Sequence, residues 1–199
     1  MNQSVLKSGP LFFILFLWIS TVSSAYSREP AKKPVLAIYP FENLTGVADY
    51  DVLSEESANL MFMDLFGRNS FKLVEMERIG DITGEKVYTE KGMDREAYLN
   101  AVKNLGADMI LFGKIRDISR ETVRKGKIKT LVRIEIRIVR LTNGELVFMK
   151  EAEGSCKNSF ESPSVMVKPF IPPMEDVKNA LQRAINEVAR RVSRKAQKF

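Results

Sequence analysis

The apolar run Val35–Tyr39 constrains the fold of this chain more than any other feature of its sequence. The run is continuous and rich in β-branched and aromatic residues, which is typical of a strand buried on both faces of a sheet. Pro40 has no N–H to donate to a neighbouring strand, so we expect the strand to end there and residues 42–46 to form a turn. The sequence therefore predicts a strand near the centre of a sheet, which the rest of the chain has to cover.

Helical and strand-like segments alternate after this run. A helix is predicted over 52–66, with an apolar side made of Ala58, Met61, Phe62, Leu65 and Phe66. A short strand over 71–75 follows, then a second helix that starts at Asp94 and ends at Gly106, and then a buried strand over 107–113. The order β-α-β-α-β favours parallel neighbours in a sheet with helices packed on it.

The second half of the chain has a different periodicity. Between Ile128 and Leu141 apolar and charged residues alternate, so that Ile134, Ile136 and Ile138 point one way and Arg133, Glu135 and Arg137 the other. This pattern predicts a strand whose sheet is covered on one face and solvated on the other. Asn143-Gly144 predicts a two-residue type I′ turn that pairs Ile138 with Met149.

The chain is predicted to close with a loop over 154–173 and a helix over 174–195 that covers the sheet. The apolar residues of this helix form a single stripe: Val177, Leu181, Ala184, Ile185, Val188 and Val192. The fold class is accordingly α/β. We expect a single domain in which a mixed sheet from β-α-β-α-β is followed by an antiparallel hairpin, with helices packed on the sheet and a C-terminal covering helix.

Residues 1–25 have the features of an export signal. Lys7 provides the positive charge, Leu11–Ile19 the apolar core and Ser23-Ser24-Ala25 the small residues of a cleavage site. The alternative is an uncleaved anchor, but the apolar run is well short of the roughly 20 residues that span a bilayer. We predict a signal peptide over 1–25, a linker over 26–33 and an exported domain over 34–199.

The composition makes catalysis an unattractive hypothesis. The 199 residues contain no histidine, which is the commonest general base and a frequent metal ligand. The single cysteine, Cys156, rules out an intramolecular disulfide and is predicted to lie in a polar loop. We therefore expect no enzyme, no catalytic or metal-binding residue and no cofactor.

The chain carries a formal net charge of +6, and its basic residues are dense over 114–140. Arg124, Lys125 and Lys127 are the candidate partner contacts within this segment. The anionic partner would be a phospholipid head group, a cell-wall polymer or nucleic acid, and the alternative interpretation is a solvated strand face. Nucleic acid is disfavoured, because the segment lacks interleaved aromatic residues that would stack on bases.

Three carboxylates gather around the first predicted loop: Glu42, Asp49 and Asp51. Ligands of open α/β sheets bind beyond the carboxyl ends of central strands, so these residues form a candidate ligand loop. The alternative is that they cap helices and face solvent.

Four segments occur in a definite order: VLAIYPFENLTG (35–46), FKLVEMER (71–78), LGADMILFGK (105–114) and LTNGELV (141–147). Together they resemble the CsgG-like group of bacterial envelope domains, which includes TolB amino-terminal-like and LpoB-like domains. The resemblance implies a periplasmic α/β domain that binds protein partners and performs no chemistry. CsgG-like channels carry a lipidated amino-terminal cysteine and insert long hairpins into the outer membrane. This sequence has no cysteine directly after its predicted signal, and its loops are too short for a second set of hairpins, so the resemblance is carried over for the CsgG-like core alone.

From this resemblance we expect an exported, non-enzymatic protein-interaction domain that serves an envelope assembly or secretion system, as in curli assembly. It would lie in the periplasm or on the periplasmic face of the outer membrane. Its partners would be envelope proteins, a second copy of itself, or an anionic membrane or cell-wall surface. The alternative function is a periplasmic small-ligand or glycan-binding protein that uses the first strand and loop.

Overall fold

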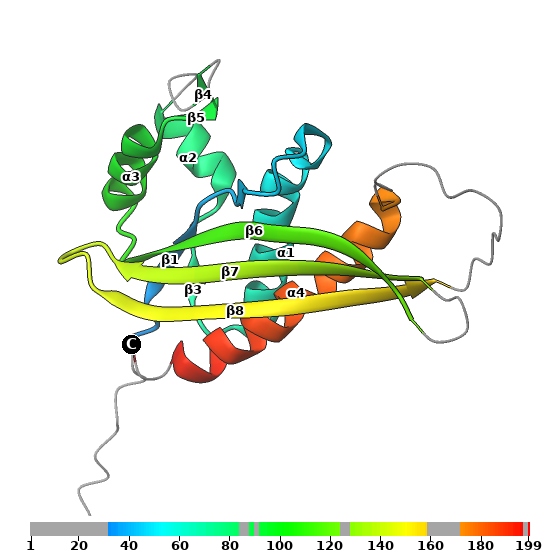
Figure 1. Cartoon of the computed structure of the whole chain (residues 1–199). Helices are drawn as coiled ribbons and strands as arrows, with labels where there is room; N and C mark the ends of the chain where they lie inside the picture. The colour runs from blue at the N-terminus through cyan, green and yellow to red at the C-terminus, as the bar shows by residue number, and fades with distance from the viewer. Residues whose placement is uncertain (1–31, 84–87, 90–91, 124–127, 159–171, 197–198) are drawn as a thin grey trace, which may run out of the picture. The chain divides into compact units, whose positions relative to one another are not determined.

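The structure is a computed structural model that describes residues 32–83, 88–89, 92–123, 128–158, 172–196 and 199. These residues belong to one compact unit, Lys32–Phe199. The unit is an α/β domain, as predicted, and contains a mixed sheet with helices on both of its faces (Figure 1).

The main sheet has the strand order β3-β1-β6-β7-β8, and its strands are β1 (Val35–Ile38), β3 (Lys72–Leu73), β6 (Met109–Thr122), β7 (Ile128–Arg140) and β8 (Leu146–Asn158). β1 runs parallel to both β3 and β6, whereas β6, β7 and β8 form an antiparallel meander. The short β2 (Glu42–Asn43) continues beyond β1 and pairs with β6 in parallel. A separate small sheet pairs β4 (Tyr88–Thr89) with β5 (Gly92–Met93). The predicted mixed topology is confirmed.

The helices cover the two faces of the sheet unequally. α1 (Leu53–Arg68) and α4 (Met174–Lys195) pack on one face, in a hydrophobic cluster that includes Leu36 and Ile38 of β1. α2 (Met76–Thr83) and α3 (Arg95–Asn104) pack on the opposite face, in a cluster that includes Ala37. Consecutive residues of β1 are thus buried on opposite faces, which confirms the prediction for this strand. The Asp94 carboxylate caps α3 by accepting hydrogen bonds from the Glu96 and Ala97 N–H groups.

α4 lies close against β7 and β8, and the predicted apolar stripe is confirmed. All of its predicted members are fully buried: Val177, Leu181, Ala184, Ile185, Val188 and Val192. Gly154 of β8 allows this approach, because a Cβ at Gly154 would lie 2.6 Å from the Ala184 nitrogen and closer still to the Ala180 carbonyl oxygen. The predicted loop over 154–173 is wrong at its start, since β8 continues to Asn158. Residues 159–171 lie outside the described part of the chain.

The turn between β7 and β8 also differs from its prediction. Ile138 pairs with Phe148 and Val139 with Leu146, so the register is irregular at this point. A type I′ turn needs a positive φ at both central residues. Gly144 has a φ of +72°, but Asn143 does not have a positive φ, since Asn69 is the one non-glycine residue with a positive φ in the described part of the chain. The connection is therefore a longer loop, closed by hydrogen bonds from Gly144 N–H to the Arg140 carbonyl and from Arg140 N–H to the Glu145 carbonyl.

α1 packs through a narrower apolar face than its sequence suggested. Ala58, Met61 and Leu65 are fully buried, whereas the Phe66 side chain is 66 % exposed. The helix continues through Gly67 to Arg68 and ends at Asn69, whose φ of +51° is left-handed. Phe66 therefore lies on a face of the helix that no described residue covers completely.

A β-bulge interrupts the pairing of β6 with β7. Ile115 pairs with Ile134 and Asp117 with Arg133, so Arg116 has no opposite residue. Before the bulge, odd-numbered residues of β6, such as Leu111 and Ile115, pack in the core cluster with α1 and α4. After the bulge, the even-numbered Ile118 packs in that cluster. The bulge therefore places both Arg116 and Asp117 on the opposite face of the sheet.

Candidate functional site

A groove of about 610 Å³ lies on the α3 side of the sheet. Its walls come from α3, from the residues that follow β1, from the first half of β6, and from the end of β7 with the turn after it. These elements meet here because Pro40 ends the parallel part of β1 while β6 and β7 continue beyond it. The groove lies at the carboxyl end of β1, where ligands of open α/β sheets bind.

The floor of the groove is apolar and partly aromatic. Tyr39 packs edge-on against Tyr98 with ring centroids 4.9 Å apart, and tilts against Phe112 at 5.7 Å. The Tyr98 hydroxyl donates a 2.5 Å hydrogen bond to the Ile38 carbonyl, which fixes its ring below the floor. Burial raises the pKa of Tyr39, and this effect outweighs the opposing charge of Arg95. The phenol therefore remains neutral at physiological pH and supplies surface and a hydroxyl.

The rim of the groove is strongly basic. Of the described residues that line it, one is acidic, Glu42, and five are cationic: Arg95, Lys103, Lys114, Arg137 and Arg140. The Arg95 guanidinium lies 4.6 Å above the centroid of the Phe112 ring. Lys114 forms an ion pair with Glu42 at 3.0 Å, and Arg140 one with Glu145 at 3.2 Å. Such a rim favours anionic groups at the edges of a ligand that rests on the apolar floor.

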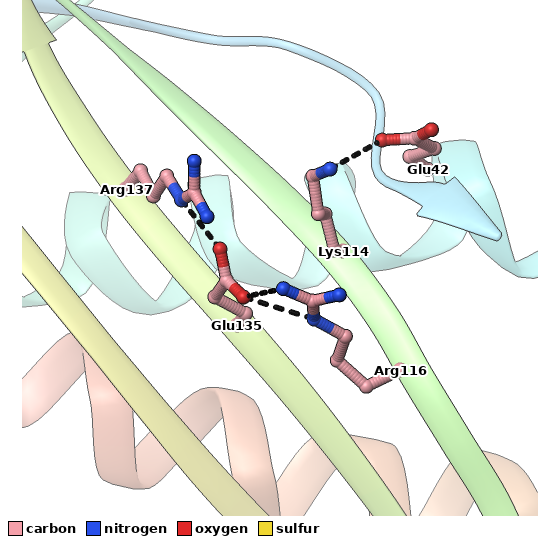
Figure 2. A network of polar contacts seen from close by, with 5 residues as sticks. All are labelled: Glu42, Lys114, Arg116, Glu135 and Arg137. Atoms are coloured by element: carbon pink, nitrogen blue, oxygen red, sulfur yellow. Dashed lines mark hydrogen bonds and ion pairs between the residues drawn. The ribbon is translucent and has the colours of Figure 1, made fainter. Parts of the chain in front are cut away.

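A polar network extends from the rim along the open part of the same face (Figure 2). Its centre is Glu135, which is 1 % exposed, although its position in the alternating pattern predicted a solvated side chain. The Glu135 carboxylate accepts a 2.9 Å hydrogen bond from Arg116 Nε and also pairs with Arg137. The two arginine side chains remain 41 % and 42 % exposed. One buried carboxylate thus fixes two guanidinium groups that still face solvent.

The ionisation of Glu135 depends on these two partners. Burial by itself raises the pKa of the carboxyl group, but the hydrogen bonds and charges of Arg116 and Arg137 outweigh it, so the pKa is lowered. The carboxylate is therefore ionised throughout the neutral range. Its role is to hold cations, because a permanently ionised and fully hydrogen-bonded carboxylate is a poor proton donor.

The predicted ligand loop is only partly brought together. Glu42 stands on the rim of the groove, but Asp49 and Asp51 are absent from its lining. Asp51 accepts a 2.7 Å hydrogen bond from Asn43 Nδ2, and Asp49 is exposed in η1 (Ala48–Tyr50). Among the described residues, no group of three or more acidic, histidine or cysteine side chains is arranged to hold a metal ion.

The predicted partner contacts Arg124, Lys125 and Lys127 lie outside the described residues. The prediction for Cys156 is wrong in position: the residue lies in β8 and is buried at 8 % exposure. Cys156 is on the α4 side of the sheet and belongs to the same cluster as Leu36.

Sequence reasoning missed the aromatic floor and the role of Glu135. The sequence predicts that Tyr39 and Phe112 belong to strands. Their contact, however, depends on the pairing of β1 with β6, which the sequence does not specify. A usable signal was present at Glu135, because this acidic residue stands between Arg133 and Arg137 in an alternating strand. Such a pattern indicates an ion-pair ladder along one face.

Within the ranges that the structure covers, every helix is too short or too polar to cross a membrane. The fold and the groove define an α/β domain with a basic-rimmed groove on one face of its mixed sheet. The family model described as "Curli production assembly/transport component CsgG" matches residues 19–196. The chain belongs to the CsgG family, and this membership supports an envelope-associated, non-enzymatic role.

Solved structures provide a second comparison. The hypothetical protein CT253 from Chlamydia trachomatis is 13 % identical with a TM-score of 0.53, over 84 % of this chain and 99 % of that one. The LpoB C-terminal domain from Salmonella enterica is 13 % identical with a TM-score of 0.45, and the match covers 61 % of this chain and 82 % of that domain. PelC from Paraburkholderia phytofirmans, a dodecamer, is 12 % identical with a TM-score of 0.46, and the match covers 81 % of this chain and 86 % of PelC. At these identities the likeness concerns the fold alone. No curated relative matches the chain.

Proposed function

We propose that this protein is an exported, non-enzymatic interaction domain that serves a bacterial envelope assembly or secretion system and binds its partner in the groove beside α3. The observation that carries the proposal is the combination of an aromatic floor with a rim of five cations among the described lining residues. Interfaces are enriched in aromatic residues and arginine, and clustered cations select an acidic partner. The match to a family described by assembly and transport supports the same function.

The residues of the groove indicate which chemical groups its partner would present. Its volume of about 610 Å³ accommodates a few side chains. The partner would insert apolar side chains over Tyr39 and Phe112 and place carboxylates near Arg95 and Lys103. We place this interaction in the periplasm, or at the periplasmic face of the outer membrane, and propose Arg124, Lys125 and Lys127 as a further contact with an anionic partner.

Charge reversal on the rim tests the proposal. Arg95→Glu with Lys103→Glu reverses two exposed rim residues, and Arg190→Glu with Arg194→Glu makes the same change on the exposed side of α4. Each variant and the wild-type chain are crosslinked in intact cells, and the captured envelope proteins are identified by mass spectrometry. We expect the rim variant to lose the partner and the α4 variant to keep it, at equal thermal midpoints. Equal capture by both variants would contradict the proposal.

A periplasmic small-ligand or glycan-binding function is the second candidate, because the groove lies beside Glu42 of the predicted ligand loop. The combined change Glu42→Gln, Asp49→Asn and Asp51→Asn separates the two functions. An interaction domain keeps its biological activity in this variant, since no proton transfer or metal coordination depends on these carboxylates. A variant that folds normally but loses activity or a bound ligand would favour the second candidate.

A further inference from the structure

The largest exposed apolar side chains of α1 form a second surface, on the face of the sheet opposite the groove. Met63 is 67 % exposed and Phe66 is 66 % exposed, and Phe62 is partly buried beside them. The rings of Phe62 and Phe66 are stacked, with centroids 6.1 Å apart and planes at 8°. We call Phe62, Met63 and Phe66 the α1 patch.

The α1 patch is a consequence of helix geometry. Residues three and four apart share one side of a helix, so Met63 and Phe66 lie together while Ala58, Met61 and Leu65 fill the core. Large apolar side chains that are exposed side by side and rimmed by polar residues form a candidate contact surface for a protein or a membrane. A hollow of about 350 Å³ adjoins the patch and continues its apolar surface to Phe71 and Leu73.

Basic residues outnumber acidic ones beside the α1 patch. Lys33 and Lys72 line the hollow together with Phe62 and Phe66, and Glu75 is its one acidic residue among the described lining residues. Arg68 follows Phe66 at the end of α1. Arg68 is held by Asp64 at 2.9 Å, and Lys33 donates a 2.7 Å hydrogen bond to the Asn69 side chain. Lys32, which precedes Lys33, is also exposed and adds a further cation to this edge.

Exposed aromatic and sulfur-containing side chains between cations form the pattern that binds the boundary between lipid head groups and acyl chains. A second copy of the chain is a poorer fit. Two side chains of this size expose about 250 Å² between them, whereas a standard interface buries about 800 Å² on each partner. An anionic bilayer needs no such area, because each basic residue near its surface strengthens binding about fivefold.

We propose that the α1 patch binds the surface of a bilayer that contains anionic phospholipid. Met63 and Phe66 enter the boundary region, and Lys33 and Lys72 pair with lipid phosphates. This binding orients the domain with α1 toward the membrane. The groove beside α3 lies on the opposite face of the sheet and remains accessible to a partner.

A single tryptophan at each end of α1 tests this placement in the protein purified from the cell envelope. Trp18 is the natural tryptophan, so Trp18→Phe provides the background, in which Phe66→Trp reports the patch. Val52→Trp is the matched control, because Val52 is 60 % exposed at the other end of α1. Vesicles of phosphatidylethanolamine and phosphatidylglycerol with brominated acyl chains are added, and tryptophan quenching and the emission maximum are recorded.

We expect quenching and a blue shift for the tryptophan at 66 and neither for the one at 52. Adding Lys33→Gln and Lys72→Gln, which removes two positive charges, should raise the lipid concentration needed for half-maximal quenching by about 25-fold. Equal quenching at both positions, or none at 66 while the chain co-floats with the vesicles, would overturn the proposal. A blue shift at 66 that follows protein concentration in the absence of vesicles would overturn it in favour of a second copy.

Discussion

The contact between Gly154 and α4 supports a sharp prediction about stability. In Gly154→Ala the new Cβ would lie 2.6 Å from the Ala184 nitrogen, whereas ordinary van der Waals contact begins at 3.4 Å. The three atoms nearest to this Cβ are all backbone atoms of α4, so no side-chain rotation relieves the overlap. Either α4 moves away from β8 or β8 bends, by more than about 1 Å, and the tight packing of the apolar stripe along α4 is loosened.

The expected magnitude follows from overpacking. Extra methyl groups in packed cores cost about 1–3 kcal/mol in the free energy of unfolding. For a domain of this size each kcal/mol lowers the thermal midpoint by about 2–4 °C. We therefore expect Gly154→Ala to lower the midpoint by about 4–8 °C at a cost near 2 kcal/mol, measured by circular dichroism or calorimetry.

Gly67→Ala is the matched control for this measurement. Gly67 lies within α1, and a Cβ there would have no atom within 4 Å. The same change should stabilise the domain by about 0.5–1 kcal/mol, because alanine loses less backbone entropy than glycine in a helix. If Gly154→Ala left the midpoint unchanged or raised it as Gly67→Ala does, the close approach of α4 to β8 would be refuted.

Three further predictions concern the sheet and the N-terminus. The pKa of Glu135 is lowered in the folded protein, so its contribution to stability is complete above the ordinary glutamate pKa of about 4.3 and is lost as the pH falls through the folded pKa. Urea unfolding should therefore show that Glu135→Gln loses less stability between pH 6 and pH 3 than the wild type does. An equal loss in both proteins would contradict this. Ile136→Asp should unfold the domain by burying an unpaired charge. Arg137→Ala should lower the free energy of unfolding by only about 1–2 kcal/mol, since Arg116 still pairs with Glu135. Thermal unfolding of the two variants, followed by circular dichroism, tests this difference. Mass spectrometry of the exported protein should find a chain that begins at Tyr26, and a retained Met1 would show that residues 1–25 form an anchor.

The sequence was sufficient wherever a single segment determines its own structure. The stripe of α4 and the cap at Asp94 are local patterns, and both are present as predicted. Pro40 and the run before it predicted the end of β1 for the same reason. Local patterns also predicted the mixed topology, because helices that alternate with strands favour parallel neighbours.

Features that depend on two segments meeting were harder to predict. Gly154 looked like the start of a loop, because nothing in its own sequence shows that a helix packs on it. Glu135 was expected to be solvated, because the alternation along its own strand does not show that Arg116 of β6 pairs with it. The groove has the same origin, since its floor and rim come from segments as distant as Tyr39, Arg95 and Arg140.

The bulge in β6 has a consequence for insertions and deletions in this chain. If Arg116 were deleted, Ile115 and Asp117 would become consecutive, and the alternation of the strand would continue without interruption into Ile118. The ladder with β7 would then be regular over its whole length, so the sheet itself has no need of a residue at this position. Glu135 would lose one of its two arginines. The extra residue of β6 thus changes the charge pattern of a surface and leaves the connectivity of the fold as it is.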